Sequence, residues 1–202
     1  MNYAVVRRAD TNWGSAFAFE LASQKRHLIL LGSGKDDLRD MAVRIRLKYQ
    51  VYIHYFEVDE SDMADIISIC DQINAHFEVD ILINYAEKRS DSNFADLDIY
   101  NLGKELRASL IASPVFTHQL LPNLMLHADA GILELRHTSF EGHFSVNDEI
   151  SCHAGVGNQA VSASCKELPW TNTCGAPAAD FAGIAKEILV SLIGCEDEAT
   201  VG

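Results

Sequence analysis

Segments typical of buried strands alternate with segments typical of amphipathic helices along almost the whole chain. Apolar runs predict strands at 3–6, 27–31, 51–58, 79–84, 131–135 and 170–174. Helical periodicity predicts helices at 12–24, 36–49, 63–76, 99–126, 148–168 and 180–193. Strands that alternate with helices build a parallel sheet through right-handed crossovers, with helices on both faces. We therefore expect an α/β fold of three layers, with a doubly wound parallel sheet in the strand order 3-2-1-4-5-6.

Length and composition predict one domain. The chain has 202 residues, of which 48% are hydrophobic and 22% charged, enough for one core and too few for two ordinary domains. No linker divides it, so we expect a single domain over 1–202 with a frayed acidic tail at 195–202. No apolar run is long enough for a transmembrane helix, and no secretory signal pattern opens the chain. These features predict a cytoplasmic protein without membrane contact.

The net charge argues against nucleic acid as a partner, and the cysteine content indicates the redox state of the thiols. The formal net charge is −13, which would repel DNA or RNA, so we expect no nucleic-acid role. The five cysteines are odd in number and scattered, which favours reduced thiols over a disulfide framework.

Several segments, taken in chain order, carry a resemblance to a known family. They are the strand-to-helix turn at 3–14, the helical stretch at 17–22, the pair at 58–59, the strand end at 80–87 and the helix at 109–122. Together they resemble the short-chain dehydrogenase/reductase family, over residues 3 to 168. The resemblance implies a Rossmann-like fold, an NAD or NADP cofactor, and reduction or oxidation of a carbonyl or alcohol. After residue 168 the chain is too short for the lid that this family places over its substrate.

The first turn departs from the family's cofactor motif, T-G-x-x-x-G-x-G. The threonine falls on Arg7, the first two glycines fall on Arg8 and Asn12, and only the third survives as Gly14. Those glycines allow the backbone to approach a pyrophosphate, and a Cβ there strains the turn or blocks the ligand. Gly14 is then a vestige of the cofactor site. An alternative is that Arg7 and Arg8 hold a phosphate through charge-assisted hydrogen bonds.

The fourth strand end departs from the family's N-N-A-G in the same way. Asn84 and Ala86 match, whereas Tyr85 and Glu87 replace the second asparagine and the glycine. We interpret Asn84 and Ala86, together with Asp59 after the third strand, as vestigial cofactor positions. Side chains should occlude the volume of the pyrophosphate, and the residues expected to project into it are Arg8, Asn12, Trp13 and Tyr85.

The catalytic tetrad of the family is absent. Its Asn, Ser, Tyr and Lys fall on Ser109, His137, Ile150 and Ala154. No tyrosine occurs in residues 101–202, so no shift of the alignment restores a Y-x-x-x-K motif. The primary hypothesis is therefore a non-catalytic binding or interaction module with no cofactor and an unknown small-molecule ligand. The alternative is a divergent NAD(P)-dependent oxidoreductase with relocated catalytic groups.

A second group of residues could carry other chemistry. His137, His143, Cys152 and His153 could in principle hold zinc, but their spacing matches no zinc motif, so we expect no metal. Cys152 with His137 or His153 is also an alternative nucleophile pair, although the sequence shows no group to orient it.

Two helices carry more apolar or small residues than one buried face requires. The predicted helix at 99–126 has several leucines beyond a single stripe, and the one at 148–168 is rich in alanine, serine and glycine. Leftover apolar surface of this kind marks an interface. We therefore expect a homodimer in which these two helices form a four-helix bundle, an arrangement that the resemblance also implies.

Overall fold

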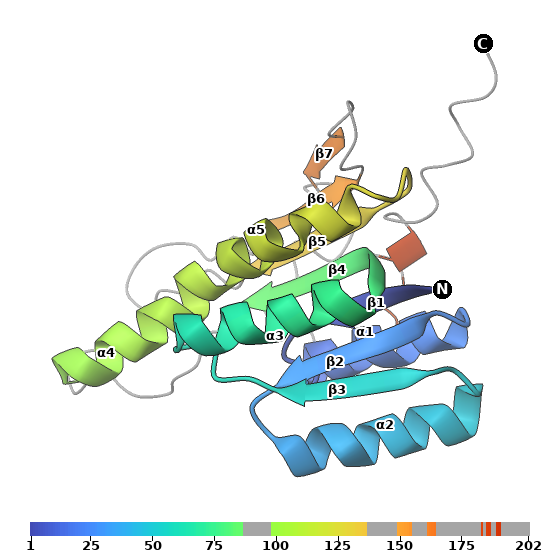
Figure 1. Cartoon of the computed structure of the whole chain (residues 1–202), viewed down its shortest axis with the longest axis horizontal. Coiled ribbons are helices and arrows are strands. Elements are labelled where there is room, and N and C mark those ends of the chain that lie inside the picture. The colour runs from blue at the N-terminus through green and yellow to red at the C-terminus, as the bar shows by residue number, and fades with distance from the viewer. Residues whose placement is uncertain are drawn as a thin grey trace.

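Five parallel strands, followed at one edge by two antiparallel strands, form a seven-stranded sheet (Figure 1). The computed structural model describes residues 1–86, 98–136, 149–154 and 161–164, and also Gly183, Ala185, Lys186, Leu189 and Val190. The parallel strands are β1 (Asn2–Val6), β2 (His27–Gly32), β3 (Ile53–Glu57), β4 (Glu78–Ala86) and β5 (Gly131–Arg136). The strand order is β3-β2-β1-β4-β5-β6-β7. The predicted α/β fold and its order over the first five strands are confirmed.

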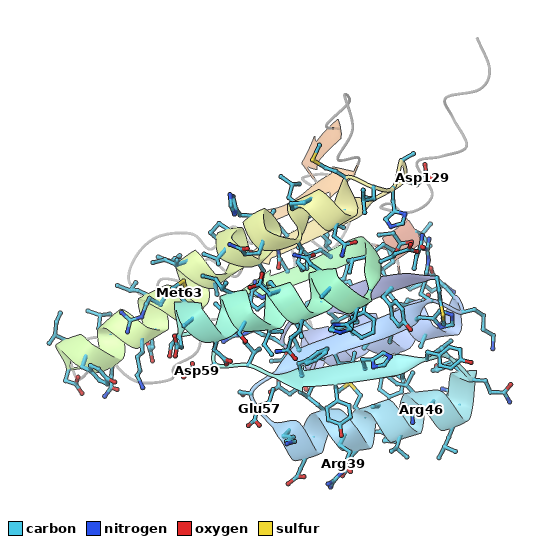
Figure 2. All side chains as sticks on the ribbon, in the orientation of Figure 1. Arg39, Arg46, Glu57, Asp59, Met63 and Asp129 are labelled. Atoms are coloured by element: carbon cyan, nitrogen blue, oxygen red, sulfur yellow. The ribbon has the colours of Figure 1, made fainter. Side chains whose placement is uncertain are left out.

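Helices cover both faces of this sheet, as expected for strands that are apolar on both sides. Helices α1 (Asn12–Ser23) and α2 (Lys35–Tyr49) pack on one face, and α3 (Met63–His76) and α5 (Ala112–Leu124) pack on the other. Successive residues of β1 point to opposite faces, so Val6 joins the first core and Val5 the second. Side chains fill the space between sheet and helices on each face (Figure 2).

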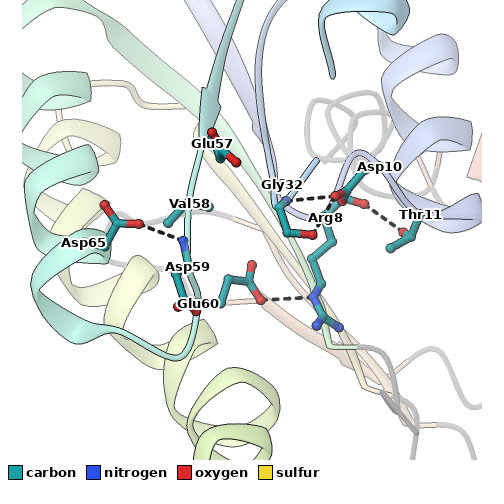
Figure 3. Close-up of a pocket in the computed structure, with 10 residues that line it drawn as sticks. Arg8, Asp10, Thr11, Gly32, Glu57, Val58, Asp59, Glu60 and Asp65 are labelled. Carbon is teal, nitrogen blue, oxygen red and sulfur yellow. Dashed lines mark hydrogen bonds and ion pairs between the residues drawn. The ribbon is translucent and has the colours of Figure 1, made fainter. Parts of the chain in front are cut away.

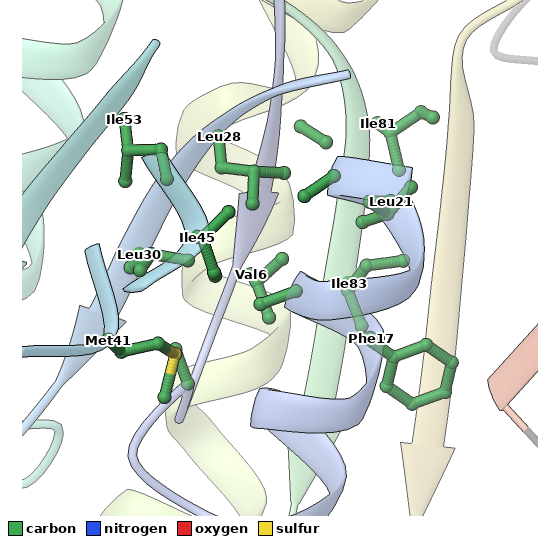
Figure 4. Close-up of a cluster of buried hydrophobic side chains, with 14 of the residues drawn as sticks. Val6, Phe17, Leu21, Leu28, Leu30, Met41, Ile45, Ile53, Ile81 and Ile83 are labelled. Carbon is green, nitrogen blue, oxygen red and sulfur yellow. The ribbon is translucent and has the colours of Figure 1, made fainter. Parts of the chain in front are cut away.

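The core beneath α1 and α2 is built from periodic apolar positions (Figure 4). Phe17 and Leu21 lie one turn apart on α1, and Met41 and Ile45 lie one turn apart on α2. They meet alternate residues of the central strands, such as Leu28. The parallel pairing of β1, β2 and β3 brings their carboxyl ends, and the turns that follow, to one edge of the sheet.

The predicted helix at 148–168 is wrong. Within this range the structure has strands β6 (Glu149–Ala154) and β7 (Val161–Ser164), which pair antiparallel with β5 and with each other. The segment is rich in small residues and lacks a strong helical period, so the open edge of β5 decides its conformation. The predicted sixth strand at 170–174 lies outside the described residues. Helical positions within the predicted helix at 180–193 include Ala185 and Leu189, both buried in the core beneath α1.

The predicted helix at 99–126 is present but is not uniform. It comprises α4 (Ile99–Leu106), a π-helical turn at Arg107–Ile111 and α5. Pro114 lies in the first turn of α5 and cannot donate to the carbonyl four residues earlier, so the wider π turn relieves this conflict. None of the helices in the described ranges has the length and apolar content needed to cross a bilayer.

Candidate functional site

A pocket of about 770 Å³ opens at the carboxyl ends of β1, β2 and β3. Its walls come from the turn after β1, the end of β2 and the segment between β3 and α3 (Figure 3). In open α/β sheets, ligands bind beyond the carboxyl ends of the strands, where the strand order reverses. That reversal lies between β1 and β4 in this sheet. The pocket is therefore the candidate binding site.

The lining of this pocket is strongly acidic. Among the described residues that line it, the carboxylates are Asp10, Glu57, Asp59, Glu60 and Asp65. Arg8 supplies the basic group on the same wall. Carboxylates accept hydrogen bonds from hydroxyl and amino groups and repel phosphates. The pocket thus favours a sugar or base over a free anion.

The turn after β1 places an arginine where a glycine would be unstrained. Arg8 has a φ of 51°, in the left-handed region that glycine adopts most readily. Thr11 then caps α1, because its Oγ1 accepts a hydrogen bond from the Gly14 backbone N–H at 3.1 Å. A Cβ on Gly14 would lie 2.0 Å from the Arg8 carbonyl oxygen. The tight approach of α1 to this turn therefore requires Gly14 whether or not a cofactor binds.

Both arginines of the turn are paired with Glu60, a residue that was not predicted from the sequence. Arg7 Nη2 lies 2.9 Å from Glu60 Oε1, and Arg8 Nε lies 3.0 Å from Glu60 Oε2. All three side chains are buried. The groups expected to contact a phosphate are thus held by an internal carboxylate. Glu60 lies in an acidic stretch that resembles a solvated surface, so no sequence pattern links it to Arg7.

Arg7 is the centre of a buried polar network between β1, β4 and β5. Arg7 Nη1 donates to Asn84 Oδ1 at 3.1 Å, and Asn84 Nδ2 donates to Glu134 Oε1 at 2.9 Å. Ser113 Oγ lies 2.6 and 2.8 Å from the two carboxylate oxygens of Glu134. The Arg7 guanidinium also lies 4.6 Å from the ring centroid of Phe116. Asn84 therefore serves a structural network, in which Ser113 and Glu134 were not predicted from the sequence.

Burial and charge oppose each other at Arg7. Burial lowers the pKa of Arg7 from its usual value, and the adjacent Glu60 carboxylate acts in the opposite direction. A guanidinium does not deprotonate in proteins near neutral pH. Arg7 therefore remains a buried cation that depends on Glu60 and Asn84.

Asp10 connects the first turn to the end of β2. Its Oδ2 accepts hydrogen bonds from the backbone N–H groups of Ser33 at 2.8 Å and Gly34 at 3.0 Å, and from Ser33 Oγ at 3.1 Å. A Cβ on Gly32 would lie 2.6 Å from Asp10 Oδ1, so this glycine makes room for the carboxylate. Asp10 was not predicted from the sequence, although an acidic residue in a turn that resembles a phosphate-binding motif is a recognisable signal.

Asp59, which was interpreted from the sequence as a vestigial cofactor position, lies just after β3 and lines the pocket (Figure 3). Its backbone N–H donates to Asp65 Oδ2 at 2.7 Å, and its Oδ1 accepts from the Ser61 N–H at 2.9 Å. The two carboxylates thus shape the segment that leads into α3.

The other residues expected to occlude the crevice do not line the pocket. Asn12 is exposed on the first turn of α1. Trp13 and Tyr85 pack on each other, with ring centroids 6.3 Å apart, and Tyr85 is buried. Ala86 is the last residue of β4. Of the four predicted occluding side chains, the structure brings only Arg8 to the pocket wall.

The positions aligned with the catalytic tetrad are not brought together as a described site. Ser109 lies in the π turn, where its Oγ donates to the Glu105 carbonyl at 2.6 Å. Ile150 and Ala154 lie on β6, a strand instead of the expected helix. His137 lies outside the described residues. Ile150 and Ala154 carry no group that can transfer a proton, and the Ser109 hydroxyl is hydrogen-bonded within its own helix.

Of the four residues named for zinc or nucleophile chemistry, two lie in the part of the chain that the structure describes. Cys152 and His153 lie on β6, whereas His143 lies outside the described residues. Within the described ranges, no group of three or more His, Cys, Asp or Glu side chains is placed to hold a metal ion. Cys70 is free, and burial raises the pKa of its thiol to about 12, so it is a poor nucleophile near neutral pH.

Sequence comparisons find no relative. No model of a protein family matches this chain, and no curated protein matches it. Structure comparison, in contrast, finds many solved structures with the same arrangement.

Three of these structures illustrate the likeness. L-sorbose reductase from Gluconobacter frateurii, complexed with NADPH and L-sorbose, is 20% identical with a TM-score of 0.57 and matches 62% of this chain and 48% of its own. A short-chain dehydrogenase from Sphingobium yanoikuyae in complex with NADPH is 18% identical with a TM-score of 0.60, over 65% and 52% of the two chains. An alcohol dehydrogenase from Thermococcus sibiricus, complexed with 5-hydroxy-NADP, is 20% identical with a TM-score of 0.57, over 62% and 54%.

These matches establish the fold. The chain has the Rossmann-like fold of short-chain dehydrogenases/reductases, as the sequence resemblance predicted. It spans about half the length of the structures that it matches.

Proposed function

We propose that this chain, with the fold of short-chain dehydrogenases/reductases, is a divergent NAD(P)-dependent oxidoreductase that acts on a carbonyl or alcohol. The observation that carries the proposal is the pocket at the carboxyl ends of β1, β2 and β3, beside the reversal of strand order. Solved neighbours complexed with NADPH or an NADP derivative support a dinucleotide ligand. This is the alternative function that the sequence left open, and the neighbours favour it over the non-catalytic hypothesis.

The residues of the pocket fit the adenosine half of such a cofactor better than its pyrophosphate. Ribose hydroxyls are hydrogen-bond donors, and the acidic wall offers acceptors such as Asp10 and Glu57. The pyrophosphate would need Arg8, whose guanidinium is already paired with Glu60 at 3.0 Å. Binding would therefore exchange one carboxylate partner of Arg8 for a phosphate.

The nicotinamide ring of the bound cofactor would donate or accept the hydride. The accompanying proton needs a group other than the family's tyrosine, because residues 101–202 contain none. The positions of the tetrad, Ser109, His137, Ile150 and Ala154, do not replace that tyrosine with another phenol. The proposal therefore requires relocated acid/base chemistry.

A specific observation favours the second candidate, a non-catalytic binding or interaction module. Glu60 already forms ion pairs with both arginines of the first turn. The substitution of all four tetrad positions points the same way. In this case the pocket would hold an unidentified small molecule and no cofactor.

Binding of NADH and NADPH, measured by thermal shift and by energy transfer from tryptophan, separates the candidates. We expect saturable binding in the wild-type chain and loss of binding in Ser33→Tyr, because a bulky side chain at this exposed position fills the pocket. Ser68→Tyr, at an exposed position on α3, is the matched control and should bind as wild type. No binding at millimolar cofactor would defeat the proposal and leave the non-catalytic module.

Activity is the second step of the test. A panel of aldehydes, ketones and alcohols with each cofactor should show turnover that Ser33→Tyr abolishes and Ser68→Tyr retains. Cofactor binding without turnover on any member would favour the non-catalytic module. Loss of turnover in His137→Ala would identify the relocated acid/base group.

A cytoplasmic location is part of the same proposal, and cell fractionation tests it.

A further inference from the structure

The second half of α2 gathers basic side chains on an otherwise acidic chain. The formal net charge is −13, yet residues 41–56 contain no Asp or Glu. In this stretch Arg44, Arg46 and Lys48 are exposed on α2, whereas every carboxylate of the helix lies at or before Asp40. Helix α2 lies at one edge of the molecule, beside the edge strand β3 (Figure 1). The basic half of the helix is therefore open to a partner.

The charges of the two halves of α2 are used differently. In the first half, Arg39 is paired with Asp36 at 3.2 Å and with Asp40 at 3.6 Å. In the second half, neither Arg44 nor Lys48 forms an ion pair with a carboxylate in the part of the chain that the structure describes. Their positive charge is thus available for an external anion.

Aromatic rings hold these cations in place. The Arg44 guanidinium carbon lies 5.3 Å from the ring centroid of Phe19 on α1, and Lys48 Nζ lies 4.9 Å from that of Tyr49. The rings of Phe19 and Tyr49 pack edge to face, 6.4 Å apart. Lys25 adds a third cation, because its Nζ donates to the Tyr49 carbonyl oxygen at 2.8 Å. Side chains that are already ordered lose less conformational freedom when a partner binds.

An apolar stripe runs beside the cations. Val43 and Leu47 lie one turn apart on α2, and their side chains are 48% and 78% exposed. Each directly precedes a cation in the sequence, so the apolar stripe and the stripe of Arg44 and Lys48 are neighbours on the helix. We call these four residues the α2 surface.

The chemistry that complements the α2 surface is an apolar side chain flanked by carboxylates. Clusters of arginine recognise acidic motifs, and amphipathic helices present apolar residues at matching intervals of one turn. A membrane or a long nucleic acid would also meet the rest of this chain, whose net charge of −13 repels it. A short segment responds mainly to charges within a Debye length of about 8 Å. A short acidic segment is therefore favoured over an extended polyanion.

We propose that the α2 surface is a docking site for an acidic amphipathic helix of another protein. Carboxylates of that helix pair with Arg44 and Lys48, and an apolar side chain covers Leu47. The inference goes beyond the proposed function and does not depend on it. The α2 surface lies about 15–20 Å along the helix from Ser33 at the pocket, at 1.5 Å per residue, so docking requires no cofactor.

Fluorescence anisotropy with a labelled synthetic peptide tests the proposal. The probe is a helical peptide of about 15 residues, with leucines four residues apart and glutamates on both sides of them. We expect saturable binding to the wild-type chain, weakened by added salt because the charges are exposed. The same peptide with glutamine in place of every glutamate should bind at least about tenfold more weakly, because it keeps the apolar contact and loses the charge.

Variants of the chain locate the site. Arg44→Gln combined with Lys48→Gln should raise the Kd of the acidic peptide by about five- to tenfold, since exposed ion pairs are individually weak. Lys35→Gln combined with Lys104→Gln removes the same charge elsewhere and should change the Kd by less than about twofold; Lys104 lies 5.0 Å from the ring centroid of Tyr100, much as Lys48 lies over Tyr49.

The apolar stripe is tested separately. Leu47→Gln should raise the Kd by about threefold or more, because it removes apolar contact without adding charge. An unchanged Kd in this variant would show that only charge is recognised, which contradicts docking of an amphipathic helix.

Several results would overturn the proposal. They are failure of the acidic peptide to bind, equal binding of its glutamine counterpart, and an equal loss of binding in the two double variants. Vesicles of phosphatidylserine and phosphatidylcholine and a single-stranded oligonucleotide are tested in parallel. If either binds more tightly than the peptide and loses binding in Arg44→Gln with Lys48→Gln, the partner is a polyanion and the acidic helix is refuted. Peptide-induced shifts of backbone amide signals in NMR should map to residues 43–48, and shifts confined to the pocket would contradict the site.

Discussion

The buried side chain of Arg7 connects the segments that surround the candidate site. It is fully buried at the carboxyl edge of the sheet, and its side chain contacts Glu60, Asn84 and the ring of Phe116. A buried ion pair contributes little compared with apolar packing, but the loss of one partner leaves an uncompensated charge. The conformation of the first turn is thus tied to the β3–α3 segment through Glu60.

Replacement of Arg7 by alanine should be strongly destabilising. The change leaves the Glu60 carboxylate buried with Arg8 as its remaining basic neighbour, and we expect a loss of about 3–5 kcal/mol in the free energy of unfolding. Chemical denaturation measures it. Arg39→Ala removes an exposed ion pair with Asp36 and should cost less than about 1 kcal/mol. Similar losses in the two variants would contradict the structural role of Arg7.

Two glycines should respond to alanine in opposite directions. Gly14→Ala places a Cβ 2.0 Å from the Arg8 carbonyl oxygen and should destabilise the fold by about 1–3 kcal/mol or more. Gly103→Ala lies inside α4, where the nearest atom is 3.6 Å away, and should stabilise it by about 0.5–1 kcal/mol. Thermal unfolding of both variants checks the pair, and a stable Gly14→Ala protein would show that the turn is not tight.

At the scale of elements, a single side chain joins the end of α5 to the start of β4. Asn123 Oδ1 accepts from the Val79 N–H at 2.9 Å, and its Nδ2 donates to the Phe77 carbonyl at 2.8 Å. Asn123 is buried, and these hydrogen bonds satisfy backbone groups that the short loop before β4 leaves unpaired. This contact ties the end of α5 to the start of β4, in addition to the apolar packing of Phe116, Leu120 and Leu124.

Asn123→Ala should therefore cost about 2–3 kcal/mol of stability, because it leaves a buried donor and a buried acceptor unsatisfied. Urea denaturation gives the value. Asn101→Ala, which removes an exposed hydrogen bond to Asp98, is the control and should have a much smaller effect. An Asn123→Ala protein as stable as Asn101→Ala would mean that water replaces both hydrogen bonds.

Elements with a strong local pattern were predictable from the sequence, and elements fixed by distant partners were not. The strand at 27–31 and the helix at 63–76 carry their own apolar runs and periodicity, and the structure confirms both. The range 148–168 has no such pattern, and pairing with β5 makes part of it β6 and β7. The site shows the same limit. Asp59 follows a recognisable strand, whereas the contact of Arg7 with Glu60 crosses 53 positions of sequence.

At the scale of the whole molecule, one apolar surface remains without a described partner. This surface consists of four exposed side chains on α4 and the π turn: Ile99, Tyr100, Leu110 and Ile111. Helix α5, which continues from the π turn, packs on the sheet. The expected dimer used this helix together with a helix at 148–168 that does not exist. The dimer stays a prediction, now built on α4 and the π turn. The single domain over 1–202 and its frayed tail also stay predictions.

Sedimentation tests the dimer. We expect the wild-type chain to sediment at twice its mass of 22.3 kDa, and Leu110→Glu to sediment as a single chain because it places a charge in the apolar interface. Leu47→Glu, also at an exposed position but on α2, should remain dimeric. A wild-type species of 22.3 kDa would refute the dimer.

The enclosure of the Arg7 side chain has a consequence for measurement. Its guanidinium lies between a carboxylate, an amide and an aromatic ring, so its N–H protons reach solvent only when the carboxyl edge of the sheet opens. Exchange of these protons with deuterium would be slow compared with that of arginines on the surface. The exchange rate of the Arg7 Nε–H proton therefore reports how often this edge of the sheet opens, and it can be measured without any ligand.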